Sequence, residues 1–88
     1  MKNIAVIGSG TMGNGIAHVF AQAGFLVSII DISEDALHKA IATIEKNLSR
    51  QVEKGSITAE VKKQALDNIR ATTFMKEGVA QADLVIEA

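Results

Sequence analysis

The chain opens with a strand, a glycine-rich turn, a helix and a second strand, and this order restricts its fold more than any other feature. An apolar run at residues 2–7 leads into glycines at positions 8, 10 and 13. Residues 11–23 have helical spacing and stop at Gly24, and a second apolar run at 25–30 closes on Asp31. Two strands joined through one helix by short connections are parallel neighbours, so the pattern predicts an α/β fold. The expected apolar face of the helix consists of Met12, Ile16, Val19, Phe20 and Ala23.

The glycine spacing is the one with which proteins hold a dinucleotide. Gly8 permits a sharp turn, Gly10 lets the backbone approach the phosphates, and Gly13 lets the helix pack on the strand. The helix N-terminus then directs free N–H groups at the pyrophosphate. Asp31 lies 23 residues after Gly8, near the position of the acid that binds the adenosine ribose. Its charge repels a 2′-phosphate and no Arg or Lys follows at 32–34, which favours NAD over NADP.

Both features also have a purely structural interpretation. A tight turn between a strand and a helix needs Gly8 and Gly13 without any ligand, but it leaves Gly10 and Asp31 unexplained. An acid that precedes a helix can cap it. Ser33 is the better cap for the next helix, so we expect Asp31 to be free for the ligand.

Composition excludes several other classes of function. The 88 residues are 48% hydrophobic, which suits one small domain. Nine basic against ten acidic residues, with three Phe as the only aromatics, argue against nucleic acid or an anionic membrane as partner. The lack of cysteine and the two scattered histidines argue against a disulfide or a metal site. No apolar run reaches transmembrane length and no signal peptide is evident, so we expect a cytoplasmic location.

The remainder of the chain predicts a helical hairpin and two more strands. A long helix begins after Ser33, carries a stripe of apolar residues and ends at Gly55. Thr58 can cap a second helix, in which the buried face consists of Val61, Ala65, Leu66 and Ile69, and strands are expected at 71–74 and 83–88. The stripe of the long helix consists of Leu37, Ile41, Ile44, Leu48 and Val52. The fold class is therefore a partial Rossmann-like, doubly wound parallel sheet with a helical-hairpin insertion after the second strand.

The chain resembles the 3-hydroxyacyl-CoA dehydrogenases over its whole length. The resemblance lies in residues 7–17, in Ala36-Leu37, in the end of the long helix at 52–55, and in the last stretch, 82–88. The double-helix crossover adds to it. Two positions depart from common forms of the family, Ser9 and Asn68, and the assignment relies on the side-chain chemistry of neither. The resemblance implies NAD-dependent interconversion of 3-hydroxyacyl-CoA and 3-oxoacyl-CoA in fatty acid or butyrate metabolism.

The resemblance also implies roles for individual residues. The turn and Asp31 bind NAD, and Ala88 at the tip of the last strand lies against the cofactor. The hairpin borders the CoA site, where Lys54 matches a lysine that contacts a CoA phosphate; a lysine near a helix C-terminus is also simply a favourable dipole partner. The expected NAD-binding residues are Gly8, Ser9, Gly10, Thr11, Met12, Gly13, Asp31 and Ala88.

The resemblance places the catalytic His and its Glu beyond residue 88, so no catalytic residue is assigned. His18 is expected to be packed or at the surface, and His38 to be solvated. We therefore interpret residues 1–88 as the N-terminal portion of an NAD-binding Rossmann domain whose remainder, with a C-terminal helical domain, is absent. This piece alone is predicted to be inactive. Its last strand would present a bare apolar edge, so we expect homo-oligomers, through that edge or by swapping.

Two other functions remain open from the residues alone. One is an NAD-dependent 3-hydroxyacid dehydrogenase that does not use CoA. The other is an NAD-responsive binding module without catalysis.

Overall fold

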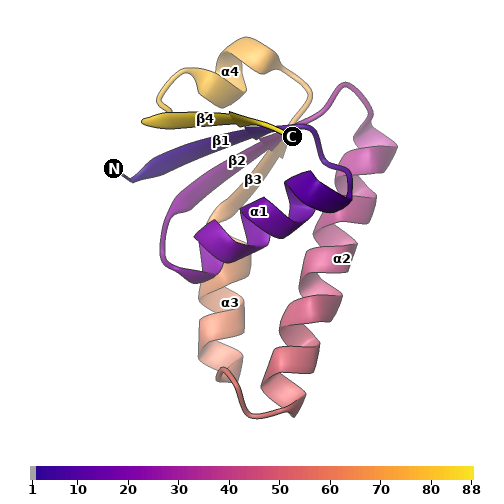
Figure 1. Cartoon of the computed structure of the whole chain (residues 1–88), viewed down its shortest axis with the longest axis vertical. Helices are drawn as coiled ribbons and strands as arrows, with labels where there is room; N and C mark the ends of the chain where they lie inside the picture. The colour runs from indigo at the N-terminus through magenta and orange to yellow at the C-terminus, as the bar shows by residue number, and fades with distance from the viewer. Residues whose placement is uncertain (1) are drawn as a thin grey trace.

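A four-stranded parallel sheet forms the centre of the computed structural model, which describes residues 2–88 (Figure 1). The strand order is β3-β2-β1-β4, and every neighbouring pair is parallel. The predicted fold class is confirmed, including the hairpin after the second strand. The elements are β1 (Asn3–Ile7), α1 (Thr11–Gln22), β2 (Leu26–Ile30), α2 (Glu34–Glu53), α3 (Ala59–Asp67), β3 (Ile69–Thr72), α4 (Met75–Val79) and β4 (Leu84–Glu87).

The hydrophobic core lies between one face of the sheet and the helices α1, α2 and α3. Ile4 pairs in register with Val27, and Val6 with Ile29, so four branched side chains line this face. All four are buried against the three helices. Because side chains alternate along a strand, Ala5 and Ile30 point to the opposite face, where α4 packs. Burial on both faces is typical of parallel sheets and explains the continuous apolar runs in the sequence.

Helix α1 packs through its small residues, which corrects the predicted apolar face. Its buried positions are Gly13, Ala17 and Ala21, whereas Met12 and Val19 are 68% and 67% exposed. The predicted Ala23 lies just past the helix and is exposed as well. Ile16 and Phe20 do contact the core, at its border. Small side chains let α1 approach the sheet and both hairpin helices closely, which larger residues would prevent.

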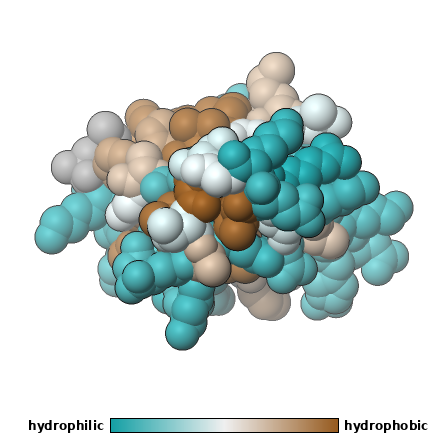
Figure 2. All heavy atoms as spheres, turned by 90° about the horizontal axis from the view of Figure 1, so that it is seen from below, coloured by the Kyte–Doolittle hydropathy of each residue, from teal (hydrophilic) through white to brown (hydrophobic). Residues whose placement is uncertain are grey.

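Both helices of the α2–α3 hairpin begin, and α2 stops, where the sequence predicts. The Ser33 hydroxyl accepts a hydrogen bond from the Ala36 N–H, and Thr58 caps α3 in the same way. Helix α2 ends at Glu53, two residues before Gly55, whose φ of 77° belongs to the left-handed region. When the molecule is seen from below the view of Figure 1, much of its surface is hydrophilic, and exposed apolar side chains lie among the hydrophilic ones (Figure 2). The fully buried residues of α2 are Leu37, Ala40, Ile44 and Leu48.

Strand β3 lies two residues earlier than the predicted 71–74. Ile69, expected on the buried face of the preceding helix, pairs with Val27 instead and opens the strand. Helix α3 has already ended, with Asn68 as its C-cap. The Asn68 side-chain amide donates to the Ala21 carbonyl oxygen at 3.1 Å and so ties the end of α3 to α1. This position, from which no chemistry was expected, therefore anchors the end of α3 directly before β3.

Candidate functional site

The carboxyl ends of β1, β2 and β4 meet at one edge of the sheet, where the glycine-rich turn begins. The Gly8 N–H donates to the Ile30 carbonyl oxygen at 2.7 Å, and the Ala88 N–H donates to the Ile7 carbonyl oxygen at 2.9 Å. A Cβ placed on Gly8, whose φ is 104°, would lie 2.8 Å from the Ala88 carbonyl oxygen. Ala88 thus lies against the turn. Ligands of open α/β sheets bind at this edge.

Gly13 is where α1 comes closest to the strand that it follows. A Cβ at this position would overlap the Gly8 carbonyl oxygen and lie 2.7 Å from the Gly8 carbonyl carbon. The obstacle is backbone, so it cannot move aside as a flexible side chain would. The predicted role of Gly13 in helix–strand packing follows directly from this contact.

The N-terminus of α1 has free donors and open space in front of it. No side chain caps it and no acidic residue occupies its first turn, whereas α2 and α3 have both a cap and an acidic first turn. Gly10 has an ordinary φ of −65°, and a Cβ there would meet nothing within 4 Å. The folded chain therefore gives no reason of its own for glycine at this position. Thr11 and Met12, both exposed, begin the helix. Uncapped N–H groups beside open space fit an anionic group such as a pyrophosphate.

Asp31 lies at the end of β2 and accepts three hydrogen bonds, which corrects the expectation that it is free. The Ser9 hydroxyl and the Ser9 N–H donate to Oδ2 at 2.7 and 3.0 Å. The Ser33 N–H donates to Oδ1 at 3.1 Å. The Ser33 N–H, then the Ser9 hydroxyl and N–H, hold the pKa of Asp31 below its ordinary value of 3.8. The half-buried side chain is thus a fixed, charged acceptor next to the turn.

Ser9 is the site residue whose contacts the sequence pattern did not reveal. It was expected only as a member of the turn, and its side chain instead joins the turn to Asp31. A signal for this contact exists in the register of the sheet, because Ile7 pairs with Ile30. Residues just after these two strand ends are therefore neighbours, although 22 positions separate them in sequence.

The structure does not bring Lys54 or the histidines to this site. Lys54 is the exposed C-cap of α2, and the 20 residues of that helix separate it from Asp31 by roughly 30 Å. His18 is half-buried on α1, with its Nε2 2.9 Å from Gln22 Oε1 and 3.1 Å from Gln51 Oε1. His38 is exposed on α2, as expected.

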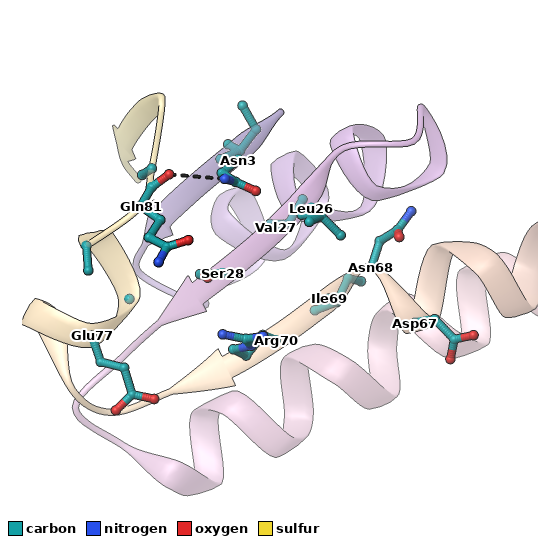
Figure 3. A pocket seen from close by; sticks show the side chains of 14 residues that line it. Asn3, Leu26, Val27, Ser28, Asp67, Asn68, Ile69, Arg70, Glu77 and Gln81 are labelled. Carbon is teal, nitrogen blue, oxygen red and sulfur yellow. Dashed lines mark hydrogen bonds between the residues drawn. The ribbon is translucent and has the colours of Figure 1, made fainter. Parts of the chain in front are cut away.

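A separate groove of about 660 Å³ lies on the α4 face of the sheet (Figure 3). Its strand residues come from the amino ends of the strands, opposite to the glycine turn. It is therefore not the candidate cofactor site, despite its size. Side chains that line it include Asn3, Leu26, Ser28, Arg70, Glu77 and Gln81.

Residues 2–88 contain neither a cluster of metal ligands nor a membrane-spanning helix. Within that range, no three His, Cys, Asp or Glu side chains come together as a metal site. No helix in the same range has both the length and the apolar character needed to cross a membrane.

Comparisons with known proteins agree with this geometry. The family model for the NAD-binding domain of 3-hydroxyacyl-CoA dehydrogenase matches residues 3–88. A 3-hydroxybutyryl-CoA dehydrogenase of Bradyrhizobium diazoefficiens is 51% identical over 87 residues, which are 99% of this chain and 29% of that protein. The chain thus spans less than a third of this relative's length.

Two solved structures extend the comparison. The crystal structure of an (S)-3-hydroxybutyryl-CoA dehydrogenase from Ralstonia eutropha has a TM-score of 0.96 and 38% identity, covering 100% of this chain and 31% of that one. A diketoreductase that acts on dicarbonyl compounds has a TM-score of 0.88 and 33% identity, covering 100% of this chain and 31% of that one. On the match over residues 3–88, the chain belongs to the 3-hydroxyacyl-CoA dehydrogenase family and corresponds to its NAD-binding domain.

Proposed function

We propose that residues 1–88 hold NAD for an enzyme that interconverts 3-hydroxyacyl-CoA and 3-oxoacyl-CoA. The observation that carries the proposal is the uncapped N-terminus of α1 beside the fixed carboxylate of Asp31. These are the two groups that a dinucleotide needs, a set of N–H donors for the pyrophosphate and a charged acceptor for the ribose. When bound, the nicotinamide supplies hydride transfer at C3 of the acyl group.

Each residue of the turn has a distinct part in this proposal. The N–H groups of Thr11, Met12 and Gly13 face the pyrophosphate, and the missing side chain of Gly10 leaves room for it. Asp31 accepts from a ribose hydroxyl and repels a 2′-phosphate. Ser9 and Ala88 border the same turn, Ser9 through its bond to Asp31 and Ala88 through its contact with Gly8.

We assign no acid–base catalysis to residues 1–88. The His18 ring nitrogen is engaged by two glutamine side chains, and His38 lies exposed on α2. The group that moves the proton of the 3-hydroxyl must then come from outside this stretch. A purified 88-residue chain should therefore bind NAD without dehydrogenase activity. Turnover by that material would contradict the assignment.

The acyl-CoA part of the proposal rests on the family and on Lys54. Lys54 is exposed where α2 ends, and an ammonium group there can meet a phosphate of CoA without rearrangement of the fold. Homo-oligomers of the 88-residue piece are also part of the proposal, because Leu84 and Val85 on β4, at one edge of the sheet that residues 2–88 form, are 38% and 46% exposed. Sedimentation at high concentration tests this, and a clean monomer would contradict it.

A second candidate function is an NAD-dependent dehydrogenase whose substrate carries no CoA. The similarity to a diketoreductase favours it. A non-catalytic NAD-responsive module is the candidate from another class. Rates with acetoacetyl-CoA and with free acetoacetate separate the first two, and NAD binding without activity in the native full-length protein would favour the third.

The cofactor preference is tested with the native full-length protein and Asp31→Ala. The wild type should use NAD well and NADP poorly, and the variant should lose most of that difference. Equal use of both cofactors by the wild type would refute the role given to Asp31.

A further inference from the structure

Ser9 is the only buried polar residue in the part of the chain that the structure describes, with 4% of its surface exposed. Burial of a hydroxyl is unfavourable unless it forms a hydrogen bond. The Ser9 hydroxyl forms one, to a charged acceptor, at 2.7 Å. Hydrogen bonds to charged groups are short and strong, so this is the firmest polar contact at the site.

The three bonds to Asp31 hold its carboxylate from two sides. Both donors of Ser9 converge on Oδ2, and the Ser33 N–H bonds to Oδ1. Rotation of the carboxylate would break the Ser9 bonds and the Ser33 bond together. The glycine turn and the start of α2 thus fix one orientation of this side chain.

The same bonds limit what a ligand can reach. A carboxylate offers about four lone-pair positions, of which the bonds from Ser9 occupy two on Oδ2 and the bond from Ser33 occupies one on Oδ1. The lone-pair position of Oδ2 that accepts from the Ser9 hydroxyl faces this buried side chain. Loss of that hydroxyl therefore loosens Asp31 without giving a ribose a new acceptor.

We propose that the buried Ser9 hydroxyl is a positioning group that sets the preference for NAD over NADP by fixing the Asp31 carboxylate. The inference rests on the proposed function, because it requires Asp31 to bind the ribose. A fixed carboxylate loses no rotational freedom when it accepts a hydrogen bond from the ribose, and it cannot turn away from a 2′-phosphate. A loosened one binds NAD less well and can rotate away from the phosphate of NADP.

The test measures Kd for NAD and for NADP by titration calorimetry of the native full-length protein. Ser9→Ala should raise the Kd for NAD about tenfold, equal to ~1.4 kcal/mol, and lower the NADP-to-NAD Kd ratio severalfold. The matched control is Ser49→Ala, because the half-buried Ser49 hydroxyl also bonds to a charged group, the Lys62 ammonium, at 2.8 Å. That variant should leave the Kd ratio unchanged even if it lowers stability.

A double variant makes the test specific to the contact. Ser9→Ala should have no further effect on the Kd ratio once Asp31→Ala is present. A pH titration of the Asp31 carboxyl ¹³C signal measures the pKa of this group, which a general loss of stability does not change. Ser9→Ala should raise that pKa.

The outcomes separate this inference from the proposed function. If Asp31→Ala loses the preference and Ser9→Ala keeps it, or binds NAD more tightly, the role of Ser9 is refuted and that of Asp31 stands. If the wild type shows no preference for NAD, or Asp31→Ala does not change it, both are refuted. A reduced ratio in Ser9→Ala with an unchanged ratio in Ser49→Ala supports both.

Discussion

The contact between Gly13 and the backbone of Gly8 allows a stability effect to be predicted with its sign and size. In Gly13→Ala, the new Cβ would lie 2.7 Å from the Gly8 carbonyl carbon and closer to its oxygen. Overpacking of a core costs about 1–3 kcal/mol and occasionally more. Because the obstacle here is backbone, the cost should reach or exceed the upper end of that range.

Alanine also brings a gain, since it is favoured over glycine inside a helix by about 1 kcal/mol. The net loss in free energy of unfolding should therefore be about 2 kcal/mol or more. This is a large part of the roughly 4–13 kcal/mol typical of a domain of this size. Urea denaturation followed by far-ultraviolet circular dichroism measures it directly.

Gly15→Ala is the matched control, because Gly15 lies in the same helix and is exposed. A Cβ there meets nothing within 4 Å, so only the helix-propensity gain of up to about 1 kcal/mol applies. The two substitutions should change stability in opposite directions. A Gly13→Ala variant as stable as the wild type, or two variants shifted alike, would refute the close approach of α1 to β1.

Two further predictions concern acid stability and helix capping. The backbone N–H groups of Asn3 and Lys2 hold the pKa of Asp83 below 3.8, as the Ser33 and Ser9 donors do for Asp31. Both carboxylates therefore contribute their full stabilisation of the fold at pH values above their pKa in the unfolded chain. This stabilisation is lost as the pH falls through their lower pKa values in the folded chain. The midpoint of urea denaturation should fall over that acid range, and it should fall less in Asp83→Asn than in the wild type. The same pH dependence in both proteins would contradict the hydrogen bonds from the Lys2 and Asn3 N–H groups to Asp83 Oδ2 at 2.8 and 2.9 Å. Thr58→Ala should cost about 1 kcal/mol by removing the α3 cap, measured by the same denaturation, whereas the exposed mid-helix Thr43→Ala should cost nothing.

The sequence predicts the frame of this molecule well because its strongest signals are local. The glycine turn, the caps Ser33 and Thr58 and the stop at Gly55 each act within a few residues, and all are confirmed. The stripe of α2 is confirmed at Leu37, Ile44 and Leu48, which are buried, and at Ile41, which packs against the core, whereas Val52 is only half-buried. A long helix with one exposed side shows its period clearly.

Packing between distant elements explains what the sequence does not predict. Helix α1 buries Ala17 and Ala21, whose small side chains carry little signal, and exposes Met12 and Val19. The start of β3 depends on the pairing of Ile69 with β2, which no local pattern encodes. The contact between Ser9 and Asp31 likewise exists only once β1 and β2 are in register.

The position of β4 has a consequence for the order in which the molecule folds. Strand β1 lies at the centre of the sheet, and its partner on one side is separated from it by about 80 residues. Pairing with β2, only about 23 residues away, closes a shorter loop and costs less chain entropy. We therefore expect β1 and β2 to pair early, while the other edge of β1 stays open until β4 arrives. Throughout that interval the apolar strand β1 is exposed to pairing with other chains.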